Sequence, residues 1–519
     1  MRANGSALIG SFGRHDQMVD ATMGNPTGYL RFNGNRSEAD DYHDGAGRQV
    51  PSAWMKWNAE ASAAWTPGAN AMLELGVGRG DGQARYAGRS MDGSQFLREG
   101  EALRYQHAAL PGILETAEVS LYRNRADHVK DNYTLRNPNP DGMMPMPMAA
   151  QVASDTRGGR AAVSWQAGAW GATMGMDLQE NRHTQRTGMG RGAHLRQPWA
   201  ADARLGNRGV FVETRYALRP ALEAVAGLRH DRAHARDLRP TIGSGMRTMP
   251  NPTAGHTRRE SLQSGFARLQ GGGKGALQWV VGLGHNQRMP DYWELFSPNR
   301  GPQGAANAFA GVRPETTTQW DAGVQYRQPR YQLWANAYAG RIRDYILFDY
   351  GSGAMPMSQA RNVDADVHGL EAGASWRGIT QWELGGSVAW AWGSQRGQSR
   401  PLPQMPPLEA RLQAQWQGQR WSAGAMLRGA ARQSRVALGQ GNVVGRDLGP
   451  SAGFGVFSLN GQYRFNDVAT LSAGVDNVFD RAYSEHLNLT GSADFGYPAE
   501  PVRIAEPGRN LWLKFSFRF

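Results

Sequence analysis

The sequence predicts an all-β protein, a transmembrane antiparallel β-barrel of 22 strands with short turns at one end and long loops at the other. The first observation behind this prediction is the C-terminal stretch 509–519 (RNLWLKFSFRF), in which apolar and polar side chains alternate. Side chains point to alternate faces of a strand, so one face of this stretch is wholly apolar. The same alternation recurs along the chain, which suits a lipid-facing outside and a wet interior.

The second observation is the spacing of the turns. Nine short turns lie near residues 66–68, 110–112, 167–168, 217–220, 270–275, 328–330, 377–378, 417–419 and 466. Long polar connections lie at 79–95, 124–157, 178–205, 232–258, 287–313, 343–360, 395–406, 434–453 and 480–507. Outer-membrane barrels have this organisation, with short periplasmic turns and long extracellular loops. The pattern yields 21 strands, and because single-chain bacterial barrels have an even number, we expect about 22.

The third observation is a set of aromatic residues close to the short turns. Tryptophan and tyrosine have an apolar ring with a polar edge, which suits the height where lipid meets water. The sequence therefore predicts an interfacial girdle. Its members are Trp65, Trp165, Trp170, Tyr216, Tyr326, Trp376, Trp416, Trp421 and Tyr463.

Composition agrees with a barrel and excludes several other classes. The 519 residues are 40% hydrophobic with a mean hydropathy of −0.57, and no run approaches the ~18–20 apolar residues of a transmembrane helix. There are no cysteines, which excludes disulfides and thiolate metal sites. The net charge is +12, but the arginines are scattered and no nucleic-acid-binding motif is present. We expect no nucleic-acid partner, and lipopolysaccharide around the loops is the simpler partner for the charge.

The sequence gives no sign of catalysis or of a leader. Residues 76–80 are glycine-rich but lack the spacing of a dinucleotide fingerprint, and no nucleophile elbow, phosphate-binding loop or zinc-protease motif appears. We therefore expect no enzyme activity, no catalytic residues and no required cofactor. The first residues, MRANGSALIGSFGR, do not form a signal peptide, so we expect a mature or truncated start.

Three stretches resemble the TonB-dependent outer-membrane receptors. Residues 475–483 (VDNVFDRAY) resemble the closing motif of that family and are followed by the final strand. Residues 288–297 (RMPDYWELFS) resemble the turn that opens a mid-barrel loop, and residues 314–317 (PETT) precede a strand as in the family. The resemblance implies a monomeric 22-strand barrel in the outer membrane, surrounded by lipid and lipopolysaccharide, with an N-terminal plug inside it that couples to the TonB complex. We expect residues 1–519 to be the barrel domain, with that plug absent from this chain.

Within the family, several N-terminal segments resemble the copper-receptor branch: 11–17, 40–45, 84–89 and 127–133. This resemblance implies a copper ion held between a Cys-x-x-x-Met pair of the plug and a His-x-Met pair of the barrel. His128 matches the barrel motif, but Lys130 stands where the methionine is expected. Lysine is positively charged at neutral pH and is a poor ligand for a cation.

Methionines support the copper hypothesis independently. The run MMPMPM (residues 143–148) lies in the 124–157 connection, where its prolines favour an extended, exposed chain. Thioethers are soft ligands that suit Cu(I), and imidazole suits both oxidation states. The predicted metal ligands are His128, Met143, Met144, Met146 and Met148. We interpret isolated loop methionines such as Met189 and Met405 as apolar filler. We interpret His183, His194 and His256 as solvated surface residues.

Three functional hypotheses remain open. In the first, the chain is a TonB-dependent receptor that transports copper ion or a copper complex. In the second, the fold is the same but the cargo is an iron–siderophore chelate, bound by aromatic and arginine side chains at the mouth. In the third, the barrel is a pore without a plug or a remnant, because a barrel of this width can conduct.

Overall fold

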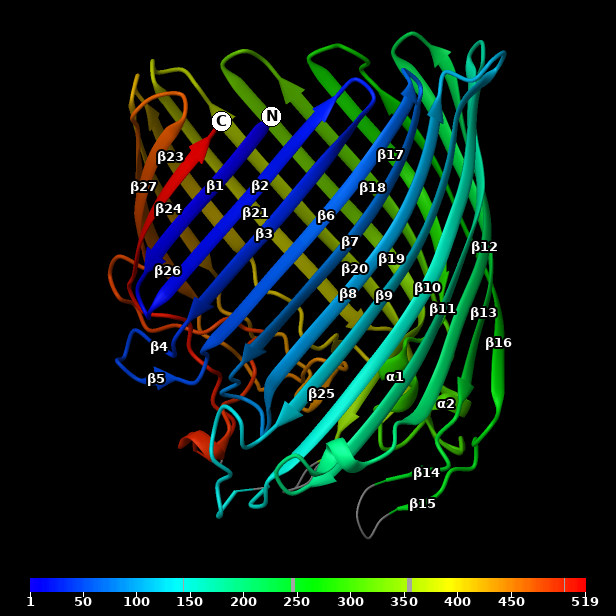
Figure 1. Ribbon diagram of the computed structural model, residues 1–519, viewed down its shortest axis with the longest axis vertical. Coiled ribbons are helices and arrows are strands. Elements are labelled where there is room, and N and C mark those ends of the chain that lie inside the picture. The colour runs from blue at the N-terminus through cyan, green and yellow to red at the C-terminus, as the bar shows by residue number, and fades with distance from the viewer. Residues whose placement is uncertain (143, 244–247, 352–356, 499) are drawn as a thin grey trace.

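A single antiparallel sheet curls into a closed barrel (Figure 1). The structure is a computed structural model that describes residues 1–142, 144–243, 248–351, 357–498 and 500–519. The first strand, β1 (Arg2–Gly10), pairs with the last, β28 (Asn510–Arg518), from Asn4 opposite Arg518 to Gly10 opposite Trp512. Because these two strands pair, the sheet has no free edge and every wall strand has a neighbour on both sides.

Within the described ranges, 22 long strands form the wall, which confirms the predicted fold class and strand number. The strands between β1 and β28 are β2 (Arg14–Asn25), β3 (Gly28–Ala39), β6 (Trp54–Gly68), β7 (Ala71–Ala84), β8 (Asp92–Ala108), β9 (Leu114–Asp131), β10 (Met148–Ala167), β11 (Trp170–Met189), β12 (Ala200–Arg219), β13 (Leu222–Asp237), β16 (Thr257–Gly271), β17 (Leu277–Arg288), β18 (Glu315–Arg327), β19 (Tyr331–Tyr350), β20 (Ser358–Trp376), β21 (Trp382–Gln395), β23 (Glu409–Gln417), β24 (Trp421–Ala430), β26 (Phe454–Arg464) and β27 (Ala469–Asp476). The nine predicted turns do not include the one at Pro26 and Thr27, between β2 and β3.

The remaining elements are short and lie in the loops at the opposite end from the short turns (Figure 1). They are β4 (Tyr42–His43), β5 (Gln49–Val50), β14 (Thr241–Ile242), β15 (Met249–Pro250), β22 (Arg400–Pro401), β25 (Gln440–Gly441), η1 (Ala193–Arg196), α1 (Tyr292–Phe296), α2 (Ala308–Gly311) and η3 (Ala493–Phe495). None of the helices in the described part of the chain is long and apolar enough to cross a bilayer.

The predicted girdle lies on the outer face at the short-turn end. Trp170 on β11 is directly opposite Tyr216 on β12, with ring centroids 4.5 Å apart. Trp421 on β24 and Tyr463 on β26 form a second pair of the same kind, also at 4.5 Å. These residues alternate with inward-facing positions and continue the apolar outer face of each strand. The girdle prediction is therefore confirmed, and it fixes the short-turn end as one membrane interface.

At the loop end, strands run far into the segments that the sequence predicts as loops. In the 124–157 connection, β9 continues to Asp131 and β10 begins at Met148, so His128 lies on a strand. The prediction missed this because the wall here is wet on both faces, which removes the apolar alternation used to recognise strands. The first connection at this end is also short, only residues 11–13, with Phe12 and Gly13 both at positive φ.

Buried apolar side chains gather under the loops, because the barrel wall itself faces lipid and lumen. One cluster joins α2 to the loop-end parts of β19 and β20 through Val312, Phe348 and Ala360. A second joins Leu295 of α1 and Phe309 of α2 to Ala235 of β13. These clusters hold folded loops against the loop end of the wall, beside the opening of the lumen.

Candidate metal site

His128 lies on the lumenal face of β9, close to the loop end of the strand. Val119 and Leu121 of the same strand are exposed to the outside, and residues an even number of positions away from them share that face. His128 and Lys130 are on the opposite face and therefore point into the barrel. The imidazole packs edge-on against Phe96 of β8, its register partner, with centroids 5.1 Å apart. The ring is thus oriented by a neighbouring strand and not by a loop.

The methionine run follows in the connection between β9 and β10, and Asn132 holds its backbone. The buried amide of Asn132, 2% exposed, donates to the carbonyl oxygen of Met144 at 2.9 Å and to that of Met146 at 3.0 Å. Its side-chain oxygen accepts from the backbone N–H of Met148 at 2.8 Å. The run is therefore fixed through its main chain, which leaves the thioethers available. Met146 is 61% exposed.

Met148 has a methionine opposite it. It is the first residue of β10 and pairs in register with Met189, the last residue of β11. Directly opposite residues of an antiparallel pair have Cβ atoms about 4.5–5.5 Å apart. Two soft ligands therefore stand side by side at the rim. We did not predict Met189 as a ligand, because strand register brings it to Met148 and register is not visible in sequence spacing.

His128 and Met148 occupy different heights on the lumenal side of the wall. The register partner of His128 on β10 is Val152, four residues beyond Met148. Four residues of strand span roughly 13 Å. The thioethers at the rim and the imidazole below them thus form two successive positions for a soft cation, with Lys130 between their levels.

The connection that carries the methionines is anchored at a second point. Arg136 forms a buried ion pair with Asp92 at the start of β8, with Nε 2.7 Å from the carboxylate. Its guanidinium also stacks over the ring of Phe495, 4.2 Å from the centroid. Three separate loops are joined by this residue, so the methionine run has a fixed place at the mouth.

Met143 lies outside the described residues. Among the residues that the structure describes, no three His, Cys, Asp or Glu side chains come together as a metal-binding group.

Two histidines that we predicted as solvated are buried. His183 lies on β11, where Nδ1 is 2.7 Å from Asp202 and the ring stacks on Tyr292 of α1 at 3.8 Å. His194 of η1 is buried beside the end of β11. The prediction is wrong for both, because loops pack on the loop end of the wall at these positions. His256 is exposed, as predicted.

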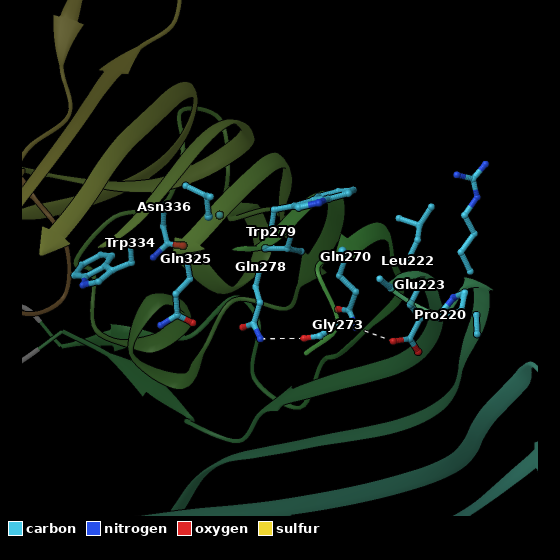
Figure 2. Close-up of a pocket in the computed structure, with 17 residues that line it drawn as sticks. Pro220, Leu222, Glu223, Gln270, Gly273, Gln278, Trp279, Gln325, Trp334 and Asn336 are labelled. Carbon is cyan, nitrogen blue, oxygen red and sulfur yellow. Dashed lines mark hydrogen bonds between the residues drawn. The ribbon is translucent and has the colours of Figure 1, made fainter. Parts of the chain in front are cut away.

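A cavity of about 720 Å³ lies at the short-turn end of the barrel (Figure 2). His128 lies near the loop end of β9. The wall of the cavity includes Glu223, which accepts from Gln270 at 2.9 Å, and Gln278, which donates to the carbonyl of Gly273 at 3.1 Å. Both hydrogen bonds lie near the turn that joins β16 and β17. We do not assign the metal site to this cavity.

Known proteins resemble the chain as follows. A family described as "TonB dependent receptor-like, beta-barrel" matches residues 32–478. The solved structure titled "Copper transporter OprC" is 46% identical with a TM-score of 0.97, covering 100% of this chain and 80% of that chain. No curated protein sequence matches.

Two more distant structures share the fold alone. The FrpB iron transporter of Neisseria meningitidis is 15% identical with a TM-score of 0.74, over 100% of this chain and 81% of that chain. The ferric-catecholate import receptor Fiu of E. coli K12 is 14% identical with a TM-score of 0.72, over 100% and 81%. The family match spans most of the chain, and the closed barrel with its girdle and loops is the fold that the family shares. This protein is therefore a member of the TonB-dependent receptor β-barrel family and resides in the outer membrane.

Proposed function

We propose that this chain is the barrel of a TonB-dependent receptor that takes up copper across the outer membrane, as the ion or as a complex. The observation that carries the proposal is the 46% identity over the whole chain with a structure titled as a copper transporter. We further propose that it works as a monomer within lipid and lipopolysaccharide, draws energy from the TonB complex through a plug outside these 519 residues, and has no catalytic activity of its own.

Capture would begin at the rim. The thioethers of Met146, Met148 and Met189 are soft, uncharged ligands that suit Cu(I). A thioether has no proton to lose, so its affinity does not fall in acid as that of imidazole or thiolate does. From the rim, the ion would pass roughly 13 Å down the same face to His128. The fixed main chain of the run reduces the ordering needed on binding.

The test is copper stoichiometry on the purified barrel under reducing conditions, measured by elemental mass spectrometry. We expect a combined variant with leucine at Met143, Met144, Met146, Met148 and Met189 to lose most bound Cu(I), and His128→Ala to lose the remainder.

A matched control makes the same substitution, methionine to leucine, on the lipid-facing side of the wall. Met23, Met174 and Met176 face outward and are exposed on the lipid side. Their replacement by leucine is expected to leave the stoichiometry unchanged. If copper stays bound to the rim variant, or leaves the lipid-face variant equally, the proposed ligands are wrong.

One observation favours the second candidate, an anionic metal chelate such as an iron–siderophore complex. Lys130 shares the lumenal face of β9 with His128, and its ammonium repels a bare cation but attracts an anion. Lys130→Met distinguishes the two. For a copper-ion receptor, the variant is expected to bind copper more tightly. For a chelate receptor, growth on chelated iron as sole source is expected to fall.

A further inference from the structure

Six arginines gather on the outside of the wall near its loop end, around the single carboxylate of Glu180, and are here called the arginine band. They are Arg182 of β11, Arg204 and Arg208 of β12, Arg232 and Arg236 of β13, and Arg259 of β16. All six are exposed. These four strands are consecutive in the wall.

The alternation of the strands places the band on the lipid side. On β11, Arg182 shares its face with Met174, Met176 and Leu178, which are all exposed. On β12, Arg204 and Arg208 share the face of the exposed Val210. The arginines thus begin where the apolar outer surface ends, on the side away from the girdle.

The registers put like charges directly beside one another. Arg204 has Arg182 opposite it on one side and Arg236 on the other. Four residues nearer the membrane, past a row formed by Glu180, Gly206 and His234, Arg208 is opposite Arg232. Like charges directly opposite in a sheet destabilise it, so this arrangement favours an anion between the guanidinium groups.

The protein supplies almost no anion itself. Across the described residues, no carboxylate pairs with Arg182, Arg204, Arg232, Arg236 or Arg259. Arg208, with 77% of its side chain exposed, reaches only Glu180, at 3.9 Å. By contrast, Arg229 on the lumenal face of β13 pairs with Asp177 at 2.7 Å and with Asp231 at 2.6 Å.

The neighbouring sector of the same outer surface, on β7 to β10, shows that the wall can balance such charges. There Arg79 is 3.7 Å from Glu99, and Asp155 contacts Arg123 at 2.6 Å, Arg157 at 3.3 Å and Arg125 at 3.6 Å. Every arginine on the outer face of that sector has a carboxylate, whereas within the described ranges five of the six arginines of the band have none.

We infer that the arginine band binds the phosphate groups of a phosphorylated glycolipid of the outer leaflet, the lipid A part of lipopolysaccharide. Guanidinium groups bind phosphate through paired, charge-assisted hydrogen bonds. The acyl chains of such a lipid would pack on the exposed Met176 and Leu228 directly below the band. Charge complementarity and continuity with the lipid-facing surface select this occupant. The inference rests on the outer-membrane location and not on the copper cargo.

The test measures lipid retention by native mass spectrometry on the full chain in detergent. The probe is lipid A that carries its phosphates, compared with the same lipid after dephosphorylation. For the variant Arg204→Gln, Arg232→Gln, Arg236→Gln, we expect the affinity for phosphorylated lipid A to fall roughly tenfold or more. Dephosphorylated lipid A is expected to bind the unmodified chain as weakly as phosphorylated lipid A binds the variant.

The control removes the same charge from the balanced sector by Arg79→Gln, Arg125→Gln, Arg157→Gln, which is expected to leave retention unchanged. The retained heat-dependent gel mobility of a folded barrel shows that each variant folds. The inference is overturned if both variants retain lipid A equally, or if inorganic phosphate displaces the lipid at equal concentration. It is also overturned if the band variant loses a dimer instead of a lipid. Copper stoichiometry is expected to be the same in all these proteins, so failure here leaves the copper proposal standing.

Discussion

The side chain of Asn132 and the main chain of Met146 are joined by a hydrogen bond of 3.0 Å, which fixes an exposed methionine from beneath. The same amide reaches Met144, and its oxygen holds the N–H of Met148. A single buried side chain therefore sets the path of the whole run. Because these contacts are all to main-chain atoms, they leave the methionine thioethers free to bind a ligand.

We expect Asn132→Ala to loosen the run without unfolding the barrel. The substitution leaves two carbonyls and one N–H without their partner, which costs about 1–3 kcal/mol of local stability. Amide hydrogen exchange at residues 144–148 is therefore expected to become roughly tenfold faster or more. Asn124→Ala, a lumenal asparagine of the same strand with no side-chain hydrogen bond among the described residues, is the control. Equal exchange in both variants would contradict the role of Asn132.

Arg136 is expected to stabilise the 132–147 connection more than an exposed, ion-paired arginine such as Arg157 stabilises its surroundings. Both Arg136 and Asp92 are buried, and removing one partner of a buried pair costs about 3–5 kcal/mol. Arg136→Ala should therefore open the 132–147 connection to chymotrypsin at Tyr133. Arg157→Ala breaks an exposed pair worth about 0–1 kcal/mol and should leave that cleavage slow. Fast cleavage in both, or in neither, would argue against the anchor.

Paired cysteines offer a direct test of the rim geometry, since the chain has no cysteine of its own. Met148 and Met189 are opposite one another, so cysteines at these two positions are expected to form a disulfide under mild oxidation. Cysteines at Met148 and Gln185, four residues away along β11, should stay reduced. The readout is a reductant-sensitive shift in gel mobility. A disulfide in the second pair but not the first would show that the register is different.

Acid is expected to loosen the long loop between β27 and β28. Burial lowers the pKa of His486 below its ordinary value of 6.5, and Arg503 lowers it further. The folded loop therefore holds fewer protons on this group than the unfolded loop does. Its contribution to stability is complete above pH 6.5 and is lost as pH falls toward the lower folded pKa.

The measurement is trypsin cleavage at Arg481 and Arg503 at about pH 7.5 and about pH 5.5. Cleavage should accelerate in acid for the unmodified chain and for His256→Gln, which changes an exposed histidine in another loop. His486→Gln should remove the acceleration, since no proton is taken up there. If His486→Gln keeps the full acid response, another group is responsible.

Sequence reasoning predicted the barrel, the girdle and the strand number because lipid imposes a strict alternation wherever it touches the wall. Leu513 and Phe515 could be placed on the outer face from their spacing alone, and they lie there. The prediction failed above the lipid, where both faces are wet. His128 therefore fell in a predicted loop although it is part of β9.

The candidate site was predictable in composition but not in geometry. Methionine clustering pointed to residues 143–148, whereas the partnership of Met148 with Met189 depends on a register set by the whole hairpin. The hydrogen bonds from Asn132 to the methionine run could not be predicted from the sequence, because an asparagine after a strand is typical of any turn. Contacts between segments distant in the chain, such as Arg136 with Phe495, require the closed barrel before they exist.

The wall of this barrel has unequal height around its circumference. β10, β11 and β12 are each 20 residues long, whereas β27 has 8 and β28 has 9. A difference of some dozen residues is roughly 40 Å of strand path, so the mouth is oblique and not level. On the tall side, Met148 and Met189 are part of the hydrogen-bonded strands β10 and β11. The low side is covered by irregular loops. Any opening and closing of the entrance should therefore come from movement of the loops on the low side, while the tall side stays fixed.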